Sequence, residues 1–167
     1  MSGPRRLTDR PFPPYRHVPG ETPHPLRDPA GYAYERPEPR LTVLDEAAWP
    51  ACPEYLYGVD LFNHGYWWEC HEVLEGLWHA AGHRSPAGEC LQAVIQCAVA
   101  HLKAETGNLR GARLLLQNAE RHASQAGSAT LGLDLQALLS ATHAYVHARS
   151  TRQAQLRPEF PADEEPA

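Results

Sequence analysis

The sequence has little lysine and no excess of basic charge. Lys103 is the one lysine among fifteen basic residues, and the formal net charge is −5 at pH 7. Proteins that bind nucleic acid or anionic lipid without specificity attract phosphate through a positively charged surface. The composition therefore argues against nucleic acid as a partner.

Long apolar runs are also missing. No stretch reaches the roughly 18 uncharged apolar residues that a membrane-spanning helix requires. The first sixteen residues contain arginines but lack the apolar segment of a signal peptide. We therefore expect neither a membrane span nor a secretory signal.

Several short motifs with known chemistry are absent. The sequence contains no P-loop, no G-x-G-x-x-G and no G-x-S-x-G, so nucleotide binding and serine hydrolase chemistry have no sequence support. It has four cysteines, but none shows the C-x-x-C spacing of a zinc knuckle or a redox site.

The cysteine spacing also argues against disulfides. If Cys90 and Cys97 share a helix, a rise of about 1.5 Å per residue places them roughly 10 Å apart, which is too far for a bond between them. Free thiols are typical of a reducing compartment. We therefore expect a cytoplasmic protein.

Proline divides the chain into three parts. Twelve of the sixteen prolines precede Glu54, so residues 1–53 are expected to form an extended Pro-rich arm. Its aromatic residues leave two alternatives, an arm docked on the domain surface or a solvated, partly disordered tail. Residues 54–150 are expected to form one helical domain, and residues 151–167 an acidic flexible tail.

Helix start and stop signals predict the fold of the middle part. Proline in a first turn, Ser or Asn at an N-cap and glycine after the last turn mark where helices begin and end. These signals predict five helices, and because the connections are short, successive helices should be antiparallel. The sequence thus predicts a compact all-α bundle, with helices over 54–63, 66–81, 86–106, 109–126 and 135–150.

The segment with the most chemical potential is LFNHGYWWECHEVLEGLW, which begins at Leu61. Residues four apart share one face of a helix, so His71 and Glu75 should lie side by side. The apolar arc of this helix includes Trp67 and Trp78, with His71 and Glu75 on its border. A buried, unpaired carboxylate costs several kcal/mol, so Glu75 requires a proton, a donor, a cation or water.

Three interpretations of this pair are open. In the first, His71 and Glu75 ligate a divalent metal ion. In the second, they perform acid–base chemistry without a metal, with Glu75 raising the pKa of His71. In the third, His71, Glu75 and Gln92 form a hydrogen-bond network that only fixes helix packing, and Trp67 and Trp78 keep water out.

In the metal interpretation, His71 and Glu75 are the ligands and Glu72 is the general base, by analogy with His-Glu-x-x-His metalloproteases. The metal and the substrate are not identified by the sequence, and neither is the third ligand. Its candidates are Gln92, His64, His101 and His79.

The chain resembles the domain-of-unknown-function family 309, which comprises small all-helical prokaryotic proteins. The resemblance covers about residues 56–145, and its matching segments are LFNHGYWWECHEVLEGLW, LQAVIQCAVAHL, TGNLRGARLLLQNA and LGLD. It implies a five-helix fold. It also places five residues on family-pattern positions, namely His71, Glu72, Glu75, Trp78 and Gln92.

Similar proteins are sometimes labelled predicted metal-dependent hydrolases, and the resemblance carries that expectation to this chain. Two positions depart from the family pattern: Ala93 replaces a glycine, and the histidine of the third helix is His101, whereas the family has it at the position of Leu102. The alternative function is a non-catalytic packing or interaction module whose tryptophan-rich face supports homo-oligomerisation.

Overall fold

The structure is a computed structural model that describes residues 4–37, 42–147 and 151–162. These ranges contain helices and no strand, which confirms the predicted all-α fold. The five α-helices and two short 3₁₀ turns are η1 (Trp49–Ala51), α1 (Pro53–Asn63), α2 (Trp67–Ala81), α3 (Pro86–Glu105), α4 (Leu109–Ala126), η2 (Thr130–Gly132) and α5 (Leu135–His147). The predicted end of the last helix, residues 148–150, lies outside the described residues.

Helix caps form where the sequence predicts them. The side chains of Ser85 and Asn108 accept hydrogen bonds from the backbone N–H of Gly88 at 3.0 Å and of Gly111 at 2.9 Å. Each such cap stabilises its helix by about 1 kcal/mol. The caps fix where α3 and α4 begin and explain why the predicted boundaries agree with the structure.

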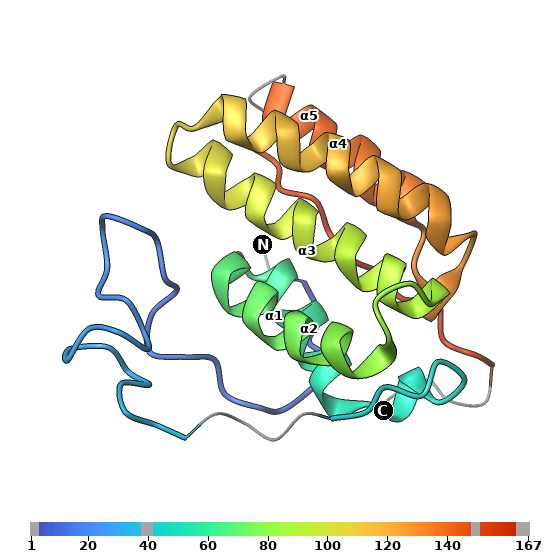
Figure 1. The fold of residues 1–167 in the computed structure, drawn as a ribbon, viewed down its shortest axis with the longest axis horizontal. Helices are drawn as coiled ribbons and strands as arrows, with labels where there is room; N and C mark the ends of the chain where they lie inside the picture. Colours follow the sequence, from blue (N-terminus) through green and yellow to red (C-terminus); the bar gives the residue numbers. More distant parts are fainter. Residues whose placement is uncertain (1–3, 38–41, 148–150, 163–167) are drawn as a thin grey trace.

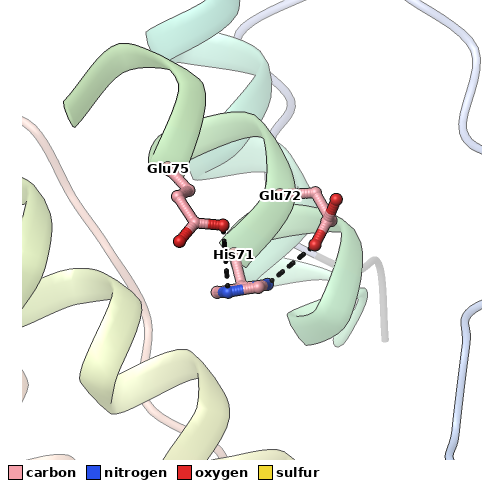
Figure 2. A group of neighbouring side chains, drawn as sticks. All are labelled: His71, Glu72 and Glu75. Atoms are coloured by element: carbon pink, nitrogen blue, oxygen red, sulfur yellow. Dashed lines mark ion pairs between the residues drawn. The ribbon is translucent and has the colours of Figure 1, made fainter. Parts of the chain in front are cut away.

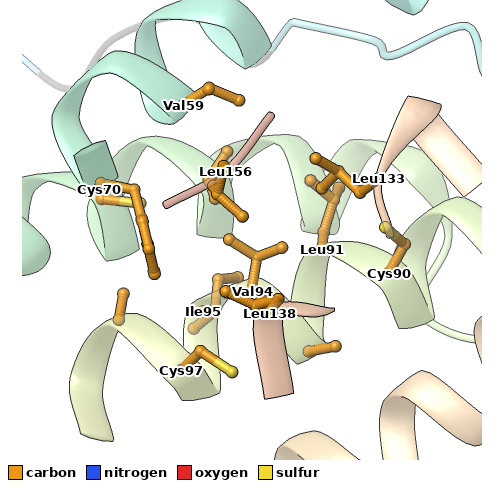
Figure 3. Packing of buried hydrophobic residues seen from close by; sticks show 14 of the residues in the cluster. Val59, Cys70, Cys90, Leu91, Val94, Ile95, Cys97, Leu133, Leu138 and Leu156 are labelled. Carbon is orange, nitrogen blue, oxygen red and sulfur yellow. The ribbon is translucent and has the colours of Figure 1, made fainter. Parts of the chain in front are cut away.

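Helix α3 is the centre of the bundle. It contacts α2 on one side and α4 and α5 on the other, and Figure 1 shows α3 and α4 running side by side. Figure 3 shows that the core between these helices is filled by aliphatic and thiol side chains. All four cysteines are free and buried, and no helix in the described ranges is long and apolar enough to cross a membrane.

The expected flexible tail is wrong for residues 151–162. Ala154 and Leu156 are buried in the core, and the Asn63 side chain holds the backbone of Leu156 by accepting from its N–H at 2.7 Å and donating to its carbonyl at 2.9 Å. The backbone N–H of Ala154 donates to His101 Nε2 at 3.2 Å. This segment stays in place because its partners satisfy both its apolar side chains and its backbone. Residues 163–167 lie outside the described residues.

The described part of the arm is docked on the domain. The carboxylate of Asp60 is fully buried and accepts from Leu7 N at 2.7 Å, Thr8 N at 2.9 Å and Thr8 Oγ1 at 2.8 Å. Further along, the Glu69 Oε1 atom accepts from His17 N at 2.7 Å and from the Tyr32 hydroxyl at 3.2 Å. For residues 4–37, the surface-docked alternative is therefore the one that the structure shows.

Gly132 is the last residue of η2, and its carbonyl accepts a hydrogen bond from Glu159 N of the C-terminal segment at 2.8 Å. We expect Gly132→Ala to lower the free energy of unfolding by about 2 kcal/mol. Its φ is +69°, and an added Cβ would lie 2.5 Å from Trp49 Cζ2 and 2.9 Å from the carbonyl oxygen of Glu159. Chemical denaturation checks this value. Gly127→Ala is the matched control, because Gly127 has φ +80° and open space around its Cβ position. Equal losses in the two variants would mean that the close contacts contribute nothing.

Candidate functional site

Helix α2 positions the candidate site at the edge of the core. Its buried positions include Trp67, Cys70, Leu74 and Leu77, which turn one face of the helix inward. The residues between them then lie on the border between core and solvent. His71, Glu72 and Glu75 are all partly buried there, as the sequence predicted for His71 and Glu75.

The two carboxylates lie on opposite sides of the imidazole ring (Figure 2). Glu72 Oε1 is 3.3 Å from His71 Nδ1, and Glu75 Oε2 is 3.5 Å from His71 Nε2. Each residue offers one ligand atom such that all three atoms lie within 4.8 Å of one another. The structure therefore brings one imidazole and two carboxylates together on a single helix.

The neighbouring acids change the protonation of His71. The contact with the Glu72 carboxylate raises the pKa of His71 above 6.5, and Glu75 adds to this effect, while burial opposes it. The Nδ1 atom is buried and completes no hydrogen bond of good geometry, although Glu72 is close. The sequence had attributed a raised pKa to Glu75, whereas the structure makes Glu72 the larger cause.

Gln92 is not joined to the pair in the described part of the chain. Its Oε1 accepts from Gln96 Nε2 at 3.1 Å, one turn along the same helix. The predicted hydrogen-bond network of His71, Glu75 and Gln92 therefore lacks its glutamine.

The two tryptophans predicted to seal the site have other neighbours. Trp67 packs against the rings of His101 and Tyr145, with centroids 5.1 and 5.9 Å away. Trp78 stacks on His83 at 3.9 Å. Within the described ranges neither indole makes a ring contact with His71. The tryptophans of α2 therefore do not cover the site.

The proposed third ligands are already engaged. His101 is fully buried, with Nδ1 bonded to the Cys97 carbonyl at 2.8 Å and Nε2 accepting from Ala154 N at 3.2 Å. His64 Nδ1 is bonded to the Asp60 carbonyl at 2.8 Å.

Glu72 is the third donor that the geometry offers in their place. The sequence predicted Glu72 as the general base, by analogy with His-Glu-x-x-His metalloproteases, and not as a ligand. Its Cα lies about 100° round the helix from that of His71. The reach of the side chain closes that gap.

A groove runs between the arm and α2, with a volume of about 800 Å³. Both carboxylates of the candidate site lie on its α2 wall, beside Gly76 and His79. The arm wall includes Arg10, Pro11, Phe12, Pro13, Pro14, Leu26, Tyr32, Ala33, Arg36 and Pro37, and Tyr57 comes from α1.

Comparison with known proteins identifies the segment that carries this site. Residues 55–115 match the family described as a domain of unknown function, DUF309. This segment spans α1 to α3 and the start of α4, so it includes His71, Glu72 and Glu75 and excludes the arm. The match confirms the family resemblance seen in the sequence. No curated protein matches the chain.

Proposed function

With residues 55–115 matching the DUF309 family, we propose that the protein is a metal-dependent hydrolase of a small molecule. A divalent cation would be held by His71, Glu72 and Glu75. The observation that carries the proposal is the convergence of three donor atoms within 4.8 Å, on a helix whose two carboxylates line a groove of about 800 Å³.

The donor set fits a divalent ion. In a tetrahedral site with metal–ligand distances near 2.1 Å, the ligand atoms lie about 3.4 Å apart. The His71–Glu75 distance of 3.5 Å already meets this value, and the 4.8 Å limit for the whole set leaves roughly an ångström of side-chain adjustment. When bound, such an ion polarises an ester oxygen and lowers the pKa of a water molecule.

The geometry also revises the role proposed for Glu72. Its Oε1 lies 3.3 Å from His71 Nδ1, whereas Glu75 Oε2 lies 3.5 Å from Nε2, so Glu72 would have to turn toward the nitrogen that binds the ion. Because one atom of each residue already lies within 4.8 Å of the other two, we propose Glu72 as the third ligand. Glu72→Gln should then weaken metal affinity as much as Glu75→Gln does. Unchanged affinity together with lost turnover would return Glu72 to the role of base.

We expect Mn²⁺ or Zn²⁺ to stabilise the untagged protein by about 2.7 kcal/mol at a concentration one hundred times its Kd. The effect should be absent in His71→Ala, because the site loses its one imidazole. Thermal melts with and without metal measure it. His143→Ala is the matched control, since His143 pairs with His147 on the exposed side of α5. Equal shifts in wild type and His71→Ala would contradict the proposal.

This binding should also depend on pH in a defined direction. Metal binds the neutral imidazole, and the pKa of His71 is raised, so affinity should increase as pH rises through that pKa. The ion pairs of His71 with Glu72 and Glu75 give the stability of the folded protein the opposite pH dependence. Their contribution to stability is present below pH 6.5 and is lost as pH rises through the folded pKa.

A second candidate function is a non-catalytic packing or interaction module. The observation favouring it is that His71 and Glu75 form an ordinary i,i+4 pair on a helix. Such pairs contribute only about 0.3–0.5 kcal/mol when half-exposed, so the network can fix little packing. The face proposed for dimerisation is also occupied, because Trp67 is buried and Trp68 packs edge-on against the rings of His17 and His24.

A further inference from the structure

The groove between the arm and α2 carries opposite charges on its two walls. Glu72 and Glu75 lie on the α2 wall, and Arg10 and Arg36 on the arm wall. Within the described ranges no ion pair joins either arginine to either glutamate. The charges therefore face the same space without neutralising each other directly.

We propose that this groove binds a phosphate monoester of an aromatic alcohol, with its phosphate on Arg10 and Arg36. The proposal rests on the proposed function, because it assigns the substrate class of the same site. Hydrolysis would form a bond from the oxygen of water to phosphorus and break the ester P–O bond. One proton of the water ends on the released alcohol.

The charge balance favours a dianion. Without metal, two carboxylates and two guanidinium groups cancel. A divalent cation on the α2 wall would neutralise the carboxylates and leave the groove with a net charge of about +2. A phosphate monoester carries about −1.5 to −2 at pH 7, which complements this charge.

The position of the Arg10 guanidinium suits the binding of a phosphate group. Its guanidinium lies over the Tyr57 ring, 4.2 Å from the centroid. A guanidinium stacked on an aromatic face keeps its N–H donors in the plane of the group and directed away from the ring. Those donors match the bidentate geometry that arginine uses with phosphate oxygens.

The remaining wall supplies apolar contacts for an aromatic group. Phe12, Leu26 and Tyr57 all line the groove, and Leu26 is 47% exposed. Phe12 is held in place by stacking on Tyr66 with centroids 4.9 Å apart. Tyr57 is buried, so the apolar contact for a bound aromatic ring would come from Leu26 and the partly buried Phe12.

The groove is preformed because α1 and α2 each hold the arm, one on either side of it. Glu69, one turn before Glu72, accepts hydrogen bonds from His17 N and from the Tyr32 hydroxyl. Asp60 on α1 fixes Leu7 and Thr8. The segment from Arg10 to Pro14 therefore lies between two fixed points of the arm, Thr8 and His17. This holds the Arg10 and Phe12 side chains at a set distance from the α2 wall.

Calorimetric titration of the Mn²⁺-loaded full chain with phenyl phosphate tests the proposal. Arg10→Gln and Arg36→Gln should each weaken binding about tenfold. Arg27→Gln is the matched control, an exposed arm arginine outside the groove, and should bind as wild type does. Phenol, which lacks the phosphate, and methyl phosphate, which lacks the ring, should both bind more weakly than phenyl phosphate.

The outcomes separate this inference from the proposed function. If Mn²⁺ binds but phenyl phosphate does not, or if both arginine variants bind it like wild type, the substrate assignment is wrong and the metal site stands. If Mn²⁺ does not bind, the charge argument and the proposed function both fail. Arg36→Gln guards against a folding artefact, because Arg36 is exposed; an unchanged thermal melt establishes that each variant is folded.

Discussion

Replacing Asp60 by alanine should lower the free energy of unfolding by about 3 kcal/mol and release the N-terminal arm. The Asp60 carboxylate is fully buried and accepts three hydrogen bonds from Leu7 and Thr8, with Arg6 Nε 3.8 Å away. Hydrogen bonds to a charged acceptor contribute about 1.5–3 kcal/mol each, and removal of the acceptor leaves buried N–H groups unpaired. Denaturant unfolding measures the loss.

Limited trypsin digestion measures the release of the arm. Its arginines should be cut much faster in Asp60→Ala than in wild type under native conditions. Asp9→Ala provides the control, because Asp9 is an exposed acid of the same segment. Digestion at the wild-type rate would show that Asp60 does not hold the arm.

Lowering the pH from 6.5 to 4 should destabilise the protein by about 3 kcal/mol through His101 alone. Burial lowers the pKa of His101 to about 4, from the usual 6.5. Because the unfolded chain takes up the proton at higher pH than the folded chain does, stability is complete above pH 6.5. It is lost as pH falls toward the folded pKa.

His101→Gln isolates this effect. Unfolding free energies measured between pH 7.5 and 4.5 should fall more steeply in wild type than in the variant. Burial raises the pKa of Glu69, which acts in the opposite direction, and the comparison between the two proteins removes that contribution. Parallel curves for wild type and His101→Gln would contradict the prediction.

The sequence predicted the helices well because their ends depend on local chemistry. Pro53 and Pro86 lie in first turns, and Ser85 and Asn108 cap the helices that follow them. The C-terminal segment could not be predicted in this way. Its position depends on Asn63, which is 93 residues away from Leu156 in sequence, and on His101. No local pattern encodes such partners.

The candidate site was predicted in part for the same reason. The His71–Glu75 pair follows from helix periodicity, and the structure shows it. The prediction that Gln92 pairs with His71 is not what the described structure shows, because the Gln92 side-chain oxygen accepts a hydrogen bond from Gln96, one turn along the same helix. The arm side of the groove was missed, since an arm without periodicity gives no sign of which helix Arg10 and Arg36 will face.

The burial of Ala154 and Leu156 has a consequence for folding during synthesis on the ribosome. While the chain is being made, the helices can form and meet, but the space beside Asn63 and His101 stays open to water until residue 156 has emerged. The final fold is therefore acquired only after nearly all of the described chain has been synthesised. A product that stops short of Ala154 would present an unfilled interior to chaperones and proteases.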